Sequence, residues 1–151
     1  MSESLAWAAG FFDGEGCVLL VTRTRGRCTE VRLQITAVNT DIRPLHRFRE
    51  LFGGSIQVVQ HPGNKHGYKP SWAWVAAHRI AENALQAMLP WLLVKREQAI
   101  IALLARAIKR QGVRGTPDTQ ALTDLLWLKE QLHFLRNSTG LGEPIPSGEV
   151  R

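Results

Sequence analysis

Residues 5–16 read LAWAAGFFDGEG, a mostly apolar stretch of small and aromatic residues that ends in two carboxylates flanked by glycines. Ala6, Gly10 and Gly14 recur every four residues, so a helix over this stretch has one face that is almost without side chains. Another helix backbone can approach such a face closely. The stretch therefore predicts a helix that packs against a second helix through its small residues.

The two carboxylates, Asp13 and Glu15, come where this helix is predicted to end, beside glycines that suit positive φ angles. A helix C-terminus already carries partial negative charge on its unpaired carbonyls, so a positive partner is needed there. Carboxylate, carbonyl and water oxygens are the ligands that Mg²⁺ prefers. A polar turn after a buried helix is the alternative interpretation, and the commoner one for a carboxylate pair taken at random.

The nine residues 8–16, AAGFFDGEG, resemble the motif of the LAGLIDADG homing endonucleases, with Glu15 in the place of the second Asp. The resemblance implies that two such helices pack together and that the last carboxylate of each binds metal at the scissile phosphates. Glu15 is then the catalytic metal ligand, helped by the carbonyl of Gly14. The implied contact between the two helices is made by Ala9, Gly10 and Asp13.

The motif occurs once in 151 residues, so an active site of two such helices requires two chains and predicts a homodimer. The implied cofactor is Mg²⁺, with Mn²⁺ or Ca²⁺ as substitutes that support binding. The length favours one domain. We expect an endonuclease domain over residues 1–137 and a flexible C-terminal tail over residues 138–151, which hold two prolines and three glycines.

The formal net charge is +6, which suits a nucleic-acid partner. Residues 1–115 hold 16 Lys and Arg against 8 Asp and Glu, a net charge of +8, whereas residues 116–151 hold 3 against 5. The positive charge thus accompanies the motif, where phosphates must be gathered. The expected partner is double-stranded DNA, and no small-molecule substrate is expected.

The two cysteines, Cys17 and Cys28, are too few for a disulfide framework or a metal cluster and suit a reducing compartment. The sequence holds no apolar run long enough for a membrane span and no secretory signal at its start. We expect a soluble intracellular protein without a membrane partner, in the cytoplasm or nucleoid of a prokaryote or in an organelle.

After the motif, residues 17–22 are apolar and β-branched, and residues 29–38 alternate between apolar and polar, which predicts two strands joined by a turn at Gly26. Such a ribbon fits the DNA major groove, where Arg and Gln match guanine and adenine edges. An ordinary solvated face is the alternative, but that usually mixes Lys with Glu. The candidate DNA contacts of this hairpin are Arg23, Arg25, Arg27, Glu30, Arg32, Gln34 and Thr36.

A helix over residues 41–52, capped by Thr40, is predicted to lead into a second hairpin with strands over residues 56–60 and 69–76. The apolar alternation is weak in this hairpin, so its two tryptophans fit the core as well as a DNA-facing surface. The candidate DNA contacts of the second hairpin are Ser55, Gln57, Lys69, Trp72 and Trp74.

Three further helices are predicted, over residues 79–88, from Pro90 to about residue 111, and from a cap at Thr116 to about residue 137. The helix led by Pro90 is also similar to the LAGLIDADG family, in which such a helix brings a basic residue close to the cleavage site. The implied match is Lys95, a catalytic residue that stabilises the charge of the phosphate or orders the attacking water.

The order of elements predicts an α+β protein with a four-stranded antiparallel sheet backed by helices. The resemblance implies the LAGLIDADG fold, αββαββα, and a homing endonuclease that makes a site-specific double-strand cut in a long pseudo-palindromic DNA site. Relatives of this kind place a polar or basic residue after the second strand, where this chain has Ala37 and Asp41. A non-cleaving DNA- or RNA-binding protein, such as a transcription regulator or an intron maturase, is therefore the alternative, and a dimeric scaffold with basic charge is a third.

Overall fold

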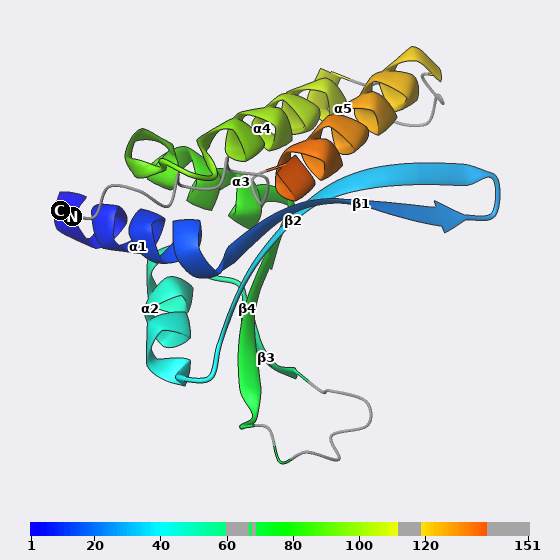
Figure 1. Cartoon of the computed structure of the whole chain (residues 1–151). Coiled ribbons are helices and arrows are strands. Elements are labelled where there is room, and N and C mark those ends of the chain that lie inside the picture. Colours follow the sequence, from blue (N-terminus) through cyan, green and yellow to red (C-terminus); the bar gives the residue numbers. More distant parts are fainter. Residues whose placement is uncertain (60–66, 68, 112–118, 139–151) are drawn as a thin grey trace, which may run out of the picture.

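The computed structural model describes residues 1–59, 67, 69–111 and 119–138 (Figure 1). The predicted cap at Thr116 and the tail from residue 139 onwards lie outside these residues. Two pairs of consecutive strands are separated and followed by helices, as expected for an α+β protein with an antiparallel sheet. The elements are α1 Ser2–Glu15, β1 Gly16–Arg25, β2 Cys28–Asn39, α2 Ile42–Phe52, β3 Ser55–Val59, β4 Ser71–Ala77, α3 His78–Met88, the 3₁₀ turn η1 Leu89–Trp91, α4 Arg96–Gln111 and α5 Thr119–Ser138.

The four strands form one antiparallel sheet in the order β1-β2-β4-β3. Strand β2 lies between β1 and β4 and pairs with the whole length of β1, from Gly16 opposite Ala37 to Arg25 opposite Cys28. Its other edge pairs with β4 only from Gln34 to Asn39. The predicted fold class is therefore confirmed, and the β1–β2 hairpin extends well beyond the rest of the sheet (Figure 1).

The two faces of the sheet differ in chemistry because side chains alternate along each strand. On one face, Val18 lies opposite Ile35 and Leu20 opposite Leu33, and all four side chains are buried. This face is the core face. On the other, which we call the open face, Arg23 lies opposite Glu30, and Arg32 and Gln34 follow two and four residues later on β2.

Helices cover the core face, and none of the helices in the described part of the chain lies on the open face (Figure 1). Helix α1 is fixed to α2 and to the sheet by a cluster of aromatic rings. Phe48 of α2 contacts Trp7 and Phe11 of α1 at centroid distances of 5.7 and 5.6 Å, and Trp74 of β4 at 4.9 Å. Phe12, on the inner side of α1, is fully buried. The position of α1 relative to the sheet is thus set by core packing.

Helix α2 begins one residue later than predicted, and its cap is Asp41 rather than Thr40. The Asp41 carboxylate accepts a hydrogen bond from the backbone N–H of Arg43 at 3.0 Å. The N–H of Asp41 in turn donates to the side chain of Asn39 at 2.8 Å. A carboxylate at this position also interacts favourably with the helix dipole, which explains why Asp41 is preferred to the preceding threonine.

The predicted helix from Pro90 to residue 111 is interrupted, which corrects the expectation. Pro90 belongs to the short turn η1, Leu92 is extended with a ψ of 134°, and α4 starts only at Arg96. The side chain of Leu92 is fully buried, so core packing holds this break in place. None of the helices in the described part of the chain combines the length and apolar character needed to cross a membrane.

Candidate functional site

Glu15 is the last residue of α1, and its side chain is exposed beside the exposed Gly14. Within the described part of the chain, the Glu15 carboxylate has no hydrogen bond or ion pair. Gly16, which follows, has a φ of −84° and is extended, so the expectation that it adopts positive φ is wrong. Gly16 is instead needed for space, because a Cβ there would lie 2.4 Å from Cδ2 of Phe12 and 2.5 Å from its carbonyl oxygen.

Lys95 lies at the same end of α1. Its ammonium group donates a hydrogen bond of 2.5 Å to the backbone carbonyl of Asp13. The Asp13 carboxylate accepts hydrogen bonds from the backbone N–H groups of Leu93, at 2.8 Å, and of Lys95, at 2.9 Å. The positive charge of Lys95 thus complements the negative end of the α1 dipole. The end of α1 and the segment before α4, which both resemble the same family, meet here. We call the site formed by Asp13, Gly14, Glu15 and Lys95 the acidic tip.

The predicted contacts of the α1 face have different outcomes. Ala9 is fully buried in the core of its own chain, so its assignment to an exposed helix-to-helix contact is wrong. The small size of alanine allows either location, and the packing of α1 on the sheet decides it. The Asp13 carboxylate accepts hydrogen bonds from the backbone N–H groups of Leu93 and Lys95, both of its own chain. Gly10 and Gly14 are exposed, and apart from the backbone of α1 itself no atom of the described chain lies within 4 Å of a Cβ added at either.

The acidic tip fits a magnesium ion only if further ligands come from outside the chain. No group of three or more His, Cys, Asp or Glu residues that could hold a metal ion occurs in the residues described. One carboxylate, from Glu15, and a backbone carbonyl are hard oxygen donors of the kind Mg²⁺ prefers. Mg²⁺ usually takes one or two protein carboxylates and completes its coordination with water and phosphate, so the donor set fits this ion.

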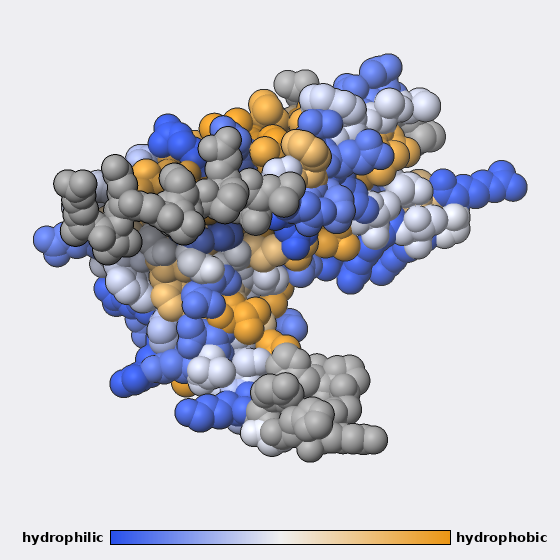
Figure 2. Space-filling view, in the orientation of Figure 1, coloured by the Kyte–Doolittle hydropathy of each residue, from blue (hydrophilic) through white to orange (hydrophobic). Residues whose placement is uncertain are grey.

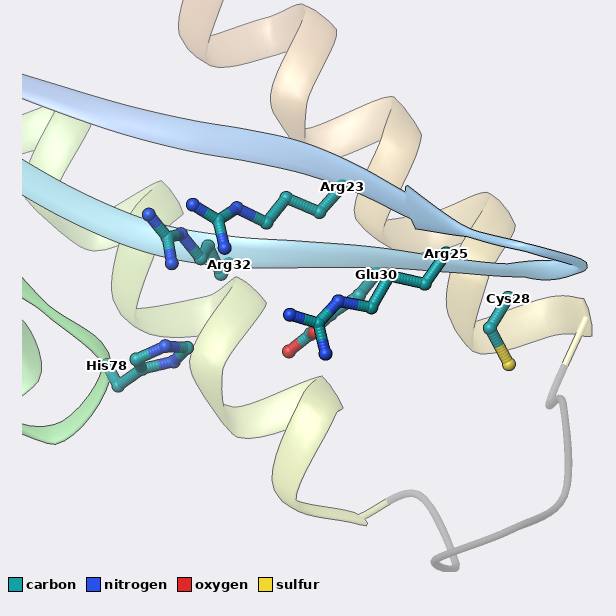
Figure 3. A pocket seen from close by; sticks show the side chains of 6 residues that line it. All are labelled: Arg23, Arg25, Cys28, Glu30, Arg32 and His78. Atoms are coloured by element: carbon teal, nitrogen blue, oxygen red, sulfur yellow. The ribbon is translucent and has the colours of Figure 1, made fainter.

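The open face of the β1–β2 hairpin carries a cluster of charged side chains (Figure 3). A pocket of about 320 Å³ is lined by Arg23, Arg25, Cys28, Glu30, Arg32 and His78. The guanidinium of Arg32 donates to the side-chain oxygen of Gln34 at 3.1 Å, which fixes the two side chains relative to each other. Figure 2 shows that the projecting end of this hairpin, at the right of the view, is hydrophilic. Five of the six lining residues come from one ribbon.

His78 was not identified from the sequence. It is the first residue of α3, directly after β4, and its φ of 53° makes it the one non-glycine residue with positive φ in the described part of the chain. Burial, together with the positive charges of Lys109 and Arg32, lowers the pKa of His78 below its usual value. No sequence pattern indicates that His78 joins this cluster. It lies 46 residues after Arg32 and 53 residues after Arg25, and no periodicity links positions so far apart.

Three further predicted DNA contacts, Thr36, Ser55 and Gln57, lie on the same open face. Thr36 of β2 lies opposite Val75 of β4, which in turn lies opposite Ser55 of β3, so these positions share the face of Arg32 and Gln34. Gln57 follows two residues after Ser55 and is exposed. Arg27 lies in the turn of the first hairpin and Lys69 just before β4, and both are exposed.

The assignment of Trp72 and Trp74 to a DNA-facing surface is wrong. Trp74 lies opposite Ala37 on the core face, is fully buried and donates its indole N–H to the carbonyl of Gly53 at 2.8 Å. Trp72 lies opposite Asn39 on the same face and packs against the core. Pairing with β2 sets which side of β4 faces inward, and large aromatic rings gain most from burial there.

No family model and no curated protein matches this sequence, but solved structures match the fold. The homing endonuclease I-CvuI, in complex with its target, gives a TM-score of 0.73 at 22% identity, over 89% of this chain and 82% of that chain. The archaeal intron-encoded homing endonuclease I-Vdi141I, complexed with DNA, gives 0.70 at 14% identity, over 88% of this chain and 84% of that chain. This chain has the LAGLIDADG fold.

The I-SmaMI LAGLIDADG homing endonuclease bound to cleaved DNA gives a TM-score of 0.62 at 16% identity. It is matched over 98% of this chain but only 51% of its own, so this chain spans about half of it. The LAGLIDADG fold implied by the motif in α1 is thus confirmed. The order αββαββα is present from α1 to α3, and α4 and α5 follow it.

Proposed function

We propose that this chain is a homing endonuclease that acts as a homodimer and makes a double-strand cut in a long pseudo-palindromic DNA site by Mg²⁺-dependent hydrolysis. The observation that supports this most directly is the acidic tip. There, Lys95 is bonded to the end of α1 beside Glu15, whose exposed carboxylate has no partner in the described residues. The LAGLIDADG structures that match the fold include complexes with DNA.

Glu15 and the carbonyl of Gly14 would hold the metal ion at the acidic tip. When bound, Mg²⁺ supplies an activated water and stabilises the charge of the leaving oxygen. Lys95 holds its ammonium group at the end of α1, where it would stabilise negative charge on the scissile phosphate. Asp13 positions Lys95 by binding its backbone N–H. One chain thus supplies one carboxylate and one ammonium group.

A second copy of the chain would complete the site through the open side of α1. Gly10 and Gly14 present backbone rather than side chains there, and nothing else in the described chain occupies the space. Two α1 helices that cross at these glycines would bring their two Glu15 carboxylates together. A two-fold interface of this kind uses the same residues from both chains.

The open face of the sheet would lie in the major groove on each side of the cut. Its arginines and Gln34 offer the paired donors and acceptors that guanine and adenine edges require. The Nε atom of Arg32 is buried without a hydrogen-bond partner among the described residues. A buried unpaired donor is unfavourable, so a side-chain movement that lets Arg32 bond a base would relieve this cost.

The test uses the full chain, a randomised duplex library and Mg²⁺, and compares the wild-type protein with Glu15→Gln. The wild-type protein is expected to yield cut ends from a defined subset of sequences. Glu15→Gln is expected to select the same sequences without cutting them, because it removes a metal ligand and no proposed base contact. Glu3→Gln, in the first turn of the same helix, is the matched control and should cut normally. Undiminished cutting by Glu15→Gln would refute the mechanism.

A non-cleaving DNA- or RNA-binding protein, such as a transcription regulator or an intron maturase, is the second candidate. One observation favours it. Ala37 is fully buried, and the carboxylate of Asp41 is bound to the side chain of Arg43 and to the start of α2, so neither assists at the acidic tip. In the library experiment this candidate predicts specific binding without cut ends. A dimeric scaffold predicts no selection of sequences at all.

A further inference from the structure

Lys109, near the end of α4, reaches from the helical layer to the open edge of β2. Strand β4 pairs with β2 only from Gln34 onwards, so residues 28–33 have no strand partner on that side among the residues that the structure describes. The ammonium group of Lys109 donates to the carboxylate of Glu30 and, at 3.3 Å, to the backbone carbonyl of Val31. A lysine from the helical layer is thus joined to a side chain of the DNA-facing surface.

Glu30 is the one carboxylate among the residues that line the pocket in Figure 3. Arg23 lies directly opposite it on β1, and Arg25 and Arg32 line the same pocket. In the described chain, however, Glu30 forms its ion pair with Lys109 and with none of these arginines. The bond to Lys109 also lowers the pKa of Glu30, so the carboxylate stays ionised. The guanidinium groups of Arg23 and Arg25 are therefore not engaged by Glu30 and stay available for DNA.

A carboxylate on a DNA-facing surface repels phosphates, so a positive charge must compensate it. Its presence there also indicates a specific contact with a base. Lys109 supplies the charge from behind the strand. A carboxylate in the major groove accepts a hydrogen bond from the amino group of cytosine. The Glu30 side chain is 52% exposed and Lys109 is 28% exposed, so the pair is anchored on its inner side and accessible on its outer side. Lys109 occupies one carboxylate oxygen, Oε1, and the other is left for a base.

We propose that Glu30 selects a cytosine in each half of the target and that Lys109 is the positioning residue that holds Glu30 for this contact. This inference rests on the proposed DNA-binding function and adds a base and a second residue to it. Lys109 contacts no base itself. It fixes the carboxylate, balances its charge and keeps it from pairing with Arg23 or Arg25.

The experiment measures base preference at every position of the selected site for four variants of the full chain. Glu30→Ala, which removes the acceptor, is expected to lose preference for one base pair in each half-site by roughly 10- to 100-fold, the discrimination of one good side-chain contact. Lys109→Met is expected to weaken preference at the same base pair, and Lys109→Arg to restore it. Lys129→Met is the matched control, since Lys129 reaches the same hairpin from α5 but donates to Thr22, on the core face, at 2.6 Å.

The outcomes separate this inference from the proposed function. If the wild-type protein selects no sequence, the proposed function itself fails. If it selects a site but Glu30→Ala gives the same base profile, the cytosine contact is refuted. If Glu30→Ala changes the profile while Lys109→Met does not, or if Lys109→Met lowers affinity equally for all sequences, the positioning role of Lys109 is refuted. A change confined to one base pair in both variants, absent in Lys129→Met, supports the inference.

Discussion

Asp13 and Lys95 are bonded to each other twice. The Asp13 carboxylate accepts a hydrogen bond from the backbone N–H of Lys95 at 2.9 Å, and the Lys95 ammonium group donates to the Asp13 carbonyl at 2.5 Å. The pair joins the end of α1 to the segment before α4 across 82 residues of chain. Each residue therefore has a structural contact, and only one of them is proposed to act on the phosphate.

This difference is testable by comparing Asp13→Ala with Lys95→Met. Asp13→Ala leaves two backbone donors without their charged acceptor. For each of the two hydrogen bonds, the free energy of unfolding is expected to fall by at most about 1.5–3 kcal/mol. Lys95→Met keeps the backbone contact, so it should be less destabilising and yet reduce the single-turnover cutting rate by about 100-fold, near 2.7 kcal/mol. Urea unfolding and cleavage kinetics measure the two effects. Normal cutting by folded Lys95→Met would limit this residue to a structural role.

Gly10→Leu is expected to leave the monomer folded and to prevent dimer formation. Gly10 is exposed, and a Cβ there meets no atom of the described chain outside the backbone of α1, so a larger side chain can extend into solvent. Leucine also favours a helix over glycine by about 0.8 kcal/mol. A helix that packs at this position, however, meets the new side chain. Sedimentation with and without target DNA measures the change. A dimer that persists in Gly10→Leu and Gly14→Leu would place the interface elsewhere.

Trp74→Phe is expected to affect stability rather than DNA binding. The change removes the indole N–H donor to the partly buried Gly53 carbonyl and leaves that acceptor without this partner, at a cost of about 1–3 kcal/mol at most. Truncation to alanine should cost about 3–5 kcal/mol because it also leaves a cavity. Thermal or urea unfolding measures the loss. A folded Trp74→Phe protein that had lost sequence preference would contradict the burial of this residue.

Arg32→Ala and Lys69→Ala are expected to weaken DNA binding in different ways. Arg32 lies on the open face next to Gln34, so its loss should relax preference at one base position and cost about 1–3 kcal/mol for the preferred sequence. Lys69 is exposed before β4, and its loss should weaken all sequences alike and reduce the salt slope by about one. Binding is measured against base variants and salt concentration. Identical behaviour of both variants would refute the division between base and phosphate contacts.

His78 should make stability depend on pH. Its pKa is lowered in the folded protein below the ordinary value of 6.5, by burial and by Lys109 and Arg32, against the raising effect of Glu30 and with a smaller lowering from Arg106. The folded state thus binds fewer protons at this residue, and its contribution is lost as the pH falls below about 6.5. His78→Gln should flatten the decline of stability between about pH 7 and 5. His133→Gln, on the exposed side of α5, is the control. Equal slopes in all three proteins would contradict this.

Strong local patterns predicted much of the fold. In β2, the alternation of Val31, Leu33 and Ile35 with Arg32 and Gln34 correctly predicts which side chains are buried and which face outward. The motif in α1 predicts the LAGLIDADG fold because its small residues and terminal carboxylates occur in a fixed order. These signals are local, and every residue needed to interpret them lies within one helix or one strand.

The errors arise where distant segments decide the outcome. Strand β4 reads SWAWVAA, in which alanine is compatible with either face, so only its pairing with β2 places Trp72 and Trp74 on the core side. Ala9 is equally ambiguous until α1 is packed on the sheet. Lys109 reaches Glu30 across 79 residues, and no periodicity links the two. The cluster around Glu30 therefore becomes visible only in three dimensions.

The contact of Phe48 with Trp7, Phe11 and Trp74 fixes the distance between the bases that the sheet would read and the bond that Glu15 would cut. With these rings packed together, α1 cannot slide to follow a differently spaced target. One base pair inserted between the two half-sites would displace the scissile phosphates from the two Glu15 carboxylates. Such a duplex is expected to be bound through its two half-sites but not cleaved. The spacing between the half-sites is then as strict a requirement for cleavage as their sequence.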